Sequence, residues 1–178
     1  MTLASKISLS RIILIIPIIY ISSFDTDLLN NLAVIIFLIA ASTDFIDGYI
    51  ARKTKTVSHL GSILDLLADK VFVVSIFIWV LFSQSNFYFL LPILLIVSRE
   101  IIISSMRQFY AEQNLSKKLE VSNLGKVKTF SHMITLSIFL KFPNGTDLQT
   151  LKLIVLWFCV LISIASMYKY LVQFFQYK

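Results

Sequence analysis

Four aspartates are the residues of this chain best suited to do chemistry, and they lie in two stretches that otherwise resemble membrane helices. Asp44 and Asp47 are three residues apart and Asp65 and Asp69 are four apart, so each pair shares one face of a helix. Charges at membrane depth are costly and usually mark a functional site. A hairpin through the polar stretch 52–60 would let all four carboxylates converge, where they would repel one another unless protons or cations intervene. Oxygen ligands favour hard cations, so the pattern predicts a one- or two-ion Mg²⁺ or Mn²⁺ site.

Small residues and one arginine accompany these aspartates. Gly48 and Gly61 flank the two pairs, and Ala51 lies one turn beyond Asp47. Small residues let a ligand or a second helix approach the backbone closely. Because these small residues lie next to the aspartates, a ligand site is favoured over helix packing alone. Arg52 follows at the expected membrane edge, where its planar guanidinium either binds a phosphate through two hydrogen bonds or acts as a basic anchor.

A second group of charged residues lies further along the chain. Arg99 falls inside an apolar stretch, where an unpaired charge is expensive, so one interpretation places it and Glu100 in structural ion pairs. Arg107, Lys126 and Lys128 lie where two apolar stretches meet the interface. These three cations either form an anion pocket beside the metal site or extend to the headgroups as anchors.

Membrane helices are the elements that must position these residues. The chain has 178 residues, 57% of them hydrophobic, and a mean hydropathy of +0.84, which is typical of an integral membrane protein. A transmembrane helix needs about 20 apolar residues. We therefore expect a single all-α domain over 1–178, with a short interfacial segment at 2–10 and a second, partly helical one at 107–124. Six transmembrane helices are predicted at about 7–22, 28–50, 62–82, 87–106, 126–142 and 148–175.

Basic residues gather in alternate connectors between these stretches, and the other connectors are poor in them. The positive-inside rule then predicts that both termini and the aspartate-bearing helix ends face the cytoplasm, in a bacterial cytoplasmic membrane or an organelle inner membrane. The net charge of +6 follows from this topology and fits contacts with anionic headgroups or substrate phosphates. No nucleic-acid-binding motif is present, so no nucleic-acid partner is expected.

The single cysteine and the two histidines do not suggest a site. Cys159 stands alone in the last apolar stretch, so it cannot form a disulfide within the chain and is interpreted as a packing residue. His59 and His132 are interpreted as structural residues, since a hard-oxygen metal site does not require imidazole.

The motif around the aspartates resembles the complete signature of the CDP-alcohol phosphotransferases. It reads Asp44-x₂-Asp47-Gly48-x₂-Ala51-Arg52-x₈-Gly61-x₃-Asp65-x₃-Asp69. Three further segments resemble the phosphatidylglycerophosphate synthase branch of that family. They are Leu64-Asp65-Leu-Leu-Ala68-Asp69-Lys70, Ser98-Arg99-Glu100-Ile101-Ile102 and Leu124-Gly125-Lys126-Val-Lys128-Thr129.

The resemblance implies a fold, a reaction and a set of site residues. The fold is the CDP-alcohol phosphotransferase fold of six transmembrane helices, commonly a homodimer, with a cytoplasm-facing site for two divalent ions. The reaction joins CDP-diacylglycerol and sn-glycerol 3-phosphate, giving phosphatidylglycerol phosphate and CMP. The implied metal ligands are Asp44, Asp47, Asp65 and Asp69, with Asp69 also the general base. The implied CDP-lipid contacts are Asp44, Gly48, Ala51, Arg52, Gly61 and Asp65. The residues implied to bind the acceptor's phosphate are Arg107, Lys126 and Lys128.

Two departures from the branch and several alternatives remain. Leu66 replaces a proline that often follows the third aspartate, and the entry pattern Asn-x-x-Thr-x-x-Arg appears as Ser5-x-x-Ser8-x-x-Arg11.

A related enzyme could use phosphatidylglycerol, as a cardiolipin synthase does, or inositol phosphate as acceptor. A catalytically dead lipid-binding relative is conceivable, although every motif aspartate is present. A divalent-cation transporter would explain the carboxylates but not the spacing of the glycines, Ala51 and Arg52.

Overall fold

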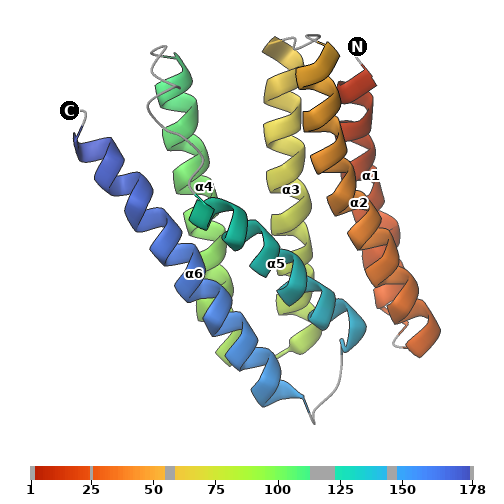
Figure 1. The fold of residues 1–178 in the computed structure, drawn as a ribbon. Coiled ribbons are helices and arrows are strands. Elements are labelled where there is room, and N and C mark those ends of the chain that lie inside the picture. The colour runs from red at the N-terminus through yellow and green to blue at the C-terminus, as the bar shows by residue number, and fades with distance from the viewer. Residues whose placement is uncertain (1–2, 25, 55–58, 113–122, 144–147, 177–178) are drawn as a thin grey trace. The chain divides into compact units, whose positions relative to one another are not determined.

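A computed structural model describes the backbone of residues 3–24, 26–54, 59–112, 123–143 and 148–176. It describes side chains over 9–24, 26–43, 66–110, 124–143, 148–172 and at 174. Across these ranges the chain is helical and contains no strand (Figure 1). The helices are α1 (Leu3–Ser22), α2 (Asp27–Thr54), α3 (His59–Gln84), α4 (Leu90–Glu112), α5 (Asn123–Lys141) and α6 (Gln149–Gln176), with a short 3-10 helix, η1 (Phe87–Phe89), before α4.

Each apolar stretch predicted to be a helix is one, and the all-α prediction is confirmed for the described residues. Three segments are long and apolar enough to cross a membrane, namely Leu66–Gln84, Phe87–Tyr110 and Gln149–Val172. Shorter apolar helical segments cover Leu9–Ser22 and Asp27–Thr43. The chain therefore has the helices of a membrane protein, and the count of six spans stays a prediction. Most of the expected segment 107–124 lies outside the described residues, which show α4 continuing to Glu112.

The residues group into two compact units, and α5 contributes to both. The first unit contains residues 1–85 and 136–146, and in it α1 packs against α2 and α3. Phe37 of α2 stacks on Phe72 of α3, with ring centroids 5.6 Å apart. Ile18, Ile76 and Phe77 are fully buried. Large side chains on three helices therefore form the core that carries the aspartate-bearing ends of α2 and α3.

Polar contacts close the first unit near the ends of its helices. Trp79 Nε1 donates to Ser22 Oγ at 3.3 Å, which joins α3 to α1. Lys141 Nζ, at the end of α5, donates to Asn31 Oδ1 of α2 at 2.6 Å. Ser85 follows α3 with φ of 47°, a left-handed conformation of the kind that commonly ends a helix. These contacts lie where the apolar segments give way to polar connectors.

The second unit contains residues 86–135 and 147–178, and in it α4 packs against α6. Asn86 is the first residue of this unit, and its side chain accepts from Tyr88 N at 3.0 Å and so caps η1. At the other end of α4, Ile103 and Tyr110 are buried together with Tyr170 of α6. Tyr110 also donates its hydroxyl to the backbone oxygen of Phe174 at 3.2 Å. The charged turn of α4 thus lies on a helix that α6 supports.

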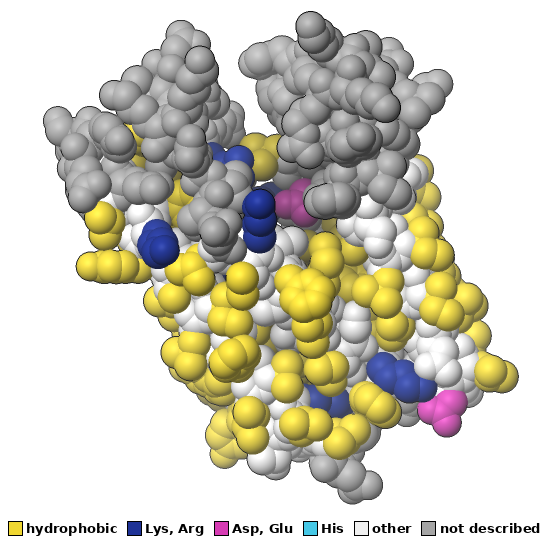
Figure 2. Space-filling view, viewed as in Figure 1, with side chains coloured by type: hydrophobic (Ala, Val, Ile, Leu, Met, Phe, Trp, Pro, Cys, Tyr) yellow, Lys and Arg dark blue, Asp and Glu magenta, His cyan; other side chains and the backbone are white. Residues whose placement is uncertain are grey.

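Large hydrophobic side chains remain exposed along the helices. Phe82, Phe158 and Leu161 are each more than 60% exposed, and Figure 2 shows hydrophobic side chains over most of the described surface on the face it presents. A water-soluble protein seldom exposes so much apolar surface, whereas lipid tails are a favourable environment for it. This exposure agrees with helices that lie in a membrane.

Candidate active site

The aspartate motif lies on the last turns of α2 and the first turns of α3. Asp44 and Asp47 fall within α2, which continues to Thr54, and Asp65 and Asp69 fall within α3, which begins at His59. Each pair is therefore about one helical turn apart on continuous helix, as the spacing predicted. The side chains of Asp44, Asp47 and Asp65 lie outside the described residues, so their predicted convergence stays a prediction.

Asp69 is the motif aspartate whose side chain is described. Its side chain is about one-third exposed, at 36%, and Lys70 Nζ lies 3.1 Å from Asp69 Oδ2. Neighbouring residues on a helix point in directions about 100° apart, so Lys70 reaches around the helix to make this contact. A partly exposed carboxylate on α3, held by an adjacent ammonium, can exchange that partner for a ligand.

The small residues and the arginine of the motif are placed by their helices. Gly48, Ala51 and Arg52 lie in the last two turns of α2, and Gly61 lies in the first turn of α3. The segment between the two helices, 55–58, and the side chain of Arg52 lie outside the described residues. No cluster of three or more acidic, histidine or cysteine side chains occurs among the side chains that are described, a set that includes Asp69 alone of the four motif aspartates.

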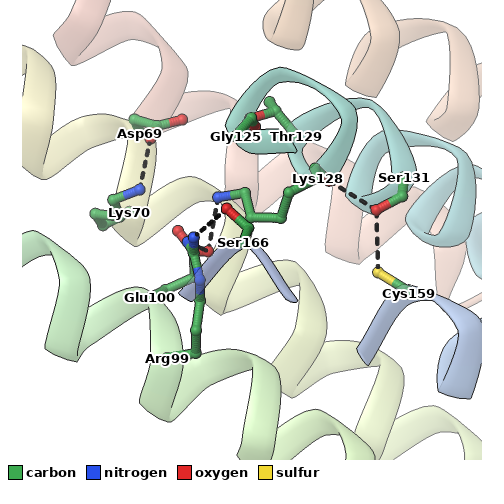
Figure 3. A network of polar contacts seen from close by, with 10 residues as sticks. All are labelled: Asp69, Lys70, Arg99, Glu100, Gly125, Lys128, Thr129, Ser131, Cys159 and Ser166. Atoms are coloured by element: carbon green, nitrogen blue, oxygen red, sulfur yellow. Dashed lines mark hydrogen bonds and ion pairs between the residues drawn. The ribbon is translucent and has the colours of Figure 1, made fainter. Parts of the chain in front are cut away.

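A buried ion triad in the second unit joins α4 to α5. Glu100 Oε1 accepts from Arg99 Nη1 at 2.7 Å and from Lys128 Nζ, also at 2.7 Å (Figure 3). All three residues are more than 90% buried. The interpretation of Arg99 and Glu100 as structural ion-pair partners is confirmed, and Lys128 is the partner from α5. Two cations and one anion leave the triad with a formal charge of +1.

The last helix also contributes to the triad. Ser166 Oγ of α6 accepts from Arg99 Nη2 at 3.0 Å, and Ser166 is fully buried. Arg99 therefore lies between an acid on its own helix and a hydroxyl on α6, with its guanidinium in a fixed orientation. We refer to Arg99, Glu100, Lys128 and Ser166 as the polar node.

A second polar contact joins α5 to α6 beside the polar node. Ser131 Oγ lies 3.6 Å from Cys159 Sγ and donates to the backbone oxygen of Lys128 at 2.8 Å. Ser131 is three residues after Lys128, so the two residues lie on the same face of α5. That face is turned toward α4 at Lys128 and toward α6 at Ser131. Cys159 is buried and without a disulfide partner, as expected of a packing residue.

The three cations assigned to the acceptor's phosphate have different surroundings. Arg107 and Lys126 are exposed, whereas Lys128 is 7% exposed and engaged by Glu100. Residues two apart on a helix point in nearly opposite directions, which explains why Lys126 faces outward when Lys128 faces inward. Lys128 is therefore not an anchor that extends to the headgroups. Whether the three cations bind one anion stays a prediction.

Several buried polar residues were not found from the sequence. Ser166 was missed, yet Cys159, Ser163 and Ser166 are small residues at helical spacing in an apolar helix and are all buried, which is a usable signal for a polar helix face. Lys152 of α6 is completely buried, and its position near a helix end gave no such signal. Arg11 of α1, interpreted from the sequence as one of the basic residues at the start of the chain and as part of the entry pattern, is also almost completely buried.

The interpretation of the two histidines as structural residues can be compared with the structure for His132. His132 is 3% exposed on the same face of α5 as Lys128, which agrees with a structural role. His59 begins α3, and its side chain lies outside the described residues.

Comparison with known proteins adds a family and several relatives. A family model described as CDP-alcohol phosphatidyltransferase matches residues 1–165. A protein of Haemophilus influenzae is 38% identical over 77% of this chain and 74% of its own length. One from Rickettsia felis is 34% identical over 94% of this chain and 92% of its own length. One from Yersinia pestis is 36% identical over 77% of this chain and 75% of its own. All three are named CDP-diacylglycerol–glycerol-3-phosphate 3-phosphatidyltransferase.

Proposed function

This chain belongs to the CDP-alcohol phosphatidyltransferase family, and we propose that it transfers the phosphatidyl group of CDP-diacylglycerol to sn-glycerol 3-phosphate. The products are phosphatidylglycerol phosphate and CMP. The observation that carries this proposal is the complete aspartate motif on α2 and α3, in a chain whose relatives bear that activity in their names. The family supports the reaction class, and the named relatives support the choice of acceptor.

The aspartates have the chemistry of a site for divalent ions. Carboxylate oxygens are the hard ligands that Mg²⁺ and Mn²⁺ prefer, and pairs one turn apart on two continuous helices can present them together. Asp44, Asp47 and Asp65 are proposed as ligands, with Asp69 as a further one. Two bound ions would neutralise the diphosphate oxygens and so make a poor electrophile reactive.

The ends of α2 and α3 are proposed to receive the cytidine diphosphate. Gly48, Ala51 and Gly61 would let the nucleotide approach the helix backbone closely, because they carry small side chains or none. Arg52, near the end of α2, would bind a phosphate through its planar guanidinium. Asp44 and Asp65 would take part in this contact as well as in holding the ions.

Asp69 is proposed as the general base. Its carboxylate would accept the proton of the acceptor hydroxyl as that oxygen attacks the β-phosphorus, and the bond to CMP breaks. The partial exposure of Asp69 supports this role, because substrate can reach the group. When the attacking oxygen and the leaving CMP lie in line on either side of the phosphorus, the protein contributes mainly the positioning of the two substrates.

The acceptor's phosphate is proposed to bind the cations of α4 and α5. Arg107 and Lys126 are exposed and can contact it directly, while Lys128 adds its positive charge from the polar node. The net charge of +1 on the ion triad favours an anion nearby, since a buried charge is weakly screened. A plain alcohol acceptor would gain nothing from these cations.

We also propose a topology and an assembly. Six transmembrane helices with both termini and the active site on the cytoplasmic side agree with the alternation of basic connectors. The cytoplasmic membrane of a bacterium is the expected location, and a homodimer is the proposed assembly. Membrane lipid supplies the first substrate.

An acceptor panel tests the proposed function. The purified protein in detergent micelles is given CDP-diacylglycerol, Mg²⁺ and one of three acceptors: sn-glycerol 3-phosphate, inositol phosphate or phosphatidylglycerol. We expect CMP release with glycerol 3-phosphate at a kcat/KM at least about 100-fold above the others. A preference for either of the other two acceptors would reassign the enzyme within its family. Metal flux into liposomes without CMP release would instead support a transporter.

A further inference from the structure

The polar node uses one carboxylate to hold two cations from different helices. Arg99 is on the same helix as Glu100 and Lys128 is on α5, and both contact Glu100 Oε1 at 2.7 Å (Figure 3). Arg99 is held separately by Ser166, so α6 supports the arginine side of the triad. The ion pair between Glu100 and Lys128 joins α5 to this support.

The link also determines how α5 is rotated. With Lys128 turned inward, the buried face of the first turns of α5 runs through Lys128, His132 and Thr135. Lys126 then lies on the opposite side and is exposed. An apolar residue at 128 would favour the same buried face, but a lysine would not: without an acid, burial of its ammonium is unfavourable. Glu100 is therefore the condition for this rotation.

We propose that Glu100 is a positioning residue, whose ion pair with Lys128 fixes the rotation of α5 and so turns Lys126 toward the acceptor's phosphate. This inference rests on the proposed function for the part that concerns the acceptor. The fixed rotation of α5 does not depend on it. Glu100 acts through Lys126 and Lys128 and does not itself contact the substrate.

A disulfide-trapping experiment measures the rotation without any enzymatic assay. Ser131→Cys places a second thiol opposite native Cys159, where the side-chain atoms are 3.6 Å apart, close enough for a disulfide after a small adjustment. The full-length protein in micelles is oxidised with copper phenanthroline, and the remaining thiols are counted with a maleimide after denaturation. We expect fast loss of both thiols with Glu100 present and a rate lower by about tenfold with Glu100→Gln, because α5 loses this ion pair with α4.

Ser105→Ala is the matched control, since Ser105 is exposed on the same helix and bonds within that helix. It should leave the trapping rate unchanged. An equal rate in the Glu100→Gln and Ser105→Ala proteins would overturn the positioning role.

Steady-state kinetics then test the consequence for the acceptor. Glu100→Gln should raise the KM for glycerol 3-phosphate by about tenfold and change the KM for CDP-diacylglycerol by less than about twofold. Lys128→Met keeps an apolar residue on the buried face of α5, so it should raise the acceptor KM by less. The double variant should be no worse than Glu100→Gln alone, because a methionine at 128 does not need the acid to stay on the buried face. Lys126→Met should raise the acceptor KM in the parent protein and have little further effect in the Glu100→Gln protein.

Besides an equal trapping rate, three outcomes would count against the inference. If kcat falls, both KM values rise together and the unfolding temperature is lower, Glu100 has only a structural role. An unchanged acceptor KM in Glu100→Gln would remove its role in acceptor binding. An undiminished effect of Lys126→Met in that background would show that Lys126 acts independently. If the parent protein releases no CMP with glycerol 3-phosphate, the proposed function fails, while disulfide trapping still decides the rotation of α5.

Discussion

Glu100 illustrates how a single buried carboxylate governs its surroundings. Arg99 and Lys128 both depend on it, so its removal would leave two cations next to each other in a site of low polarity. Breaking a buried pair by removing one partner typically costs about 3–5 kcal/mol, because the remaining charge is uncompensated. Replacing Lys128 instead would leave the neutral pair of Arg99 and Glu100, which is the milder change. The acid is therefore the critical member of the triad.

Asp69, the proposed general base, should be needed for turnover but not for binding of CDP-diacylglycerol. Asp69→Asn removes the proton acceptor but keeps the shape of the side chain, so turnover should fall by at least about 100-fold, the lower range of general-base catalysis. Binding of CDP-diacylglycerol should change little. CMP release and equilibrium binding of a labelled CDP-lipid measure the two effects in one preparation.

Asp27→Asn is the matched control for this prediction. Asp27 begins α2, and its side chain is 95% exposed, so the same chemical change there should leave turnover within about twofold of the parent protein, as surface substitutions usually do. Turnover of the Asp69→Asn protein close to that of Asp27→Asn would remove Asp69 as the base.

At the scale of elements, α3 must be held firmly because it carries Asp65 and Asp69. Its buried face includes Phe72, Ile76 and Phe77, and Phe72 stacks on Phe37 of α2. The pair is nearly parallel, at 8° between ring planes, and adds a favourable aromatic contact to ordinary packing. Packing of α2 and α3 against α1, together with this ring contact, therefore holds the two helices that carry the aspartate motif.

Truncating this aromatic pair should loosen the motif. Phe72→Ala should lower the free energy of unfolding by about 3 kcal/mol, the lower end for a large-to-small change in a core. Phe82→Ala on the same helix should cost less than about 0.5 kcal/mol, because the Phe82 side chain is 74% exposed and its truncation removes little packing from the core. Thermal or SDS-induced unfolding in micelles measures both. Equal losses in the two variants would mean that the α2–α3 contact does not stabilise the fold.

For the whole molecule, the decisive question is how the helices cross the membrane. With 23 residues, α4 is about 35 Å long at 1.5 Å per residue, which exceeds the hydrocarbon thickness of about 30 Å. Exposed aromatic residues, Phe87 and Tyr88, precede it, and exposed Arg107 lies near its other end. Aromatic residues are typical of both interfaces and basic residues of the cytoplasmic one.

Cysteine labelling in intact cells tests this orientation. In a Cys159→Ala background, Ser85→Cys lies before α4 and Gln108→Cys lies near its cytoplasmic end by our proposal. A membrane-impermeant maleimide should label position 85 directly and position 108 only after the membrane is permeabilised. Labelling of position 108 in sealed cells would reverse the orientation, and labelling of both positions would mean that α4 does not span.

Much of this protein follows from the sequence alone. Runs of apolar residues determine where helices form, because a backbone in lipid must satisfy its hydrogen bonds within the segment, and the ends of α1 to α6 lie close to the predicted limits. The spacing of the aspartates places each pair on one helix face, and the resemblance of the whole motif to that of the CDP-alcohol phosphotransferases indicates the reaction class. Arg99 was recognised as needing a partner because an unpaired charge in that position is too costly.

The tertiary structure decided which groups meet. Glu100 contacts Lys128 across 28 positions of the chain and Arg99 contacts Ser166 across 67, and no local pattern encodes such pairings. The sequence grouped Lys126 with Lys128 as two neighbouring cations, whereas the rotation of α5 separates them into an exposed and a buried lysine. Helix periodicity determines that two such residues diverge, but only the packing of α4, α5 and α6 decides which of them faces the acid.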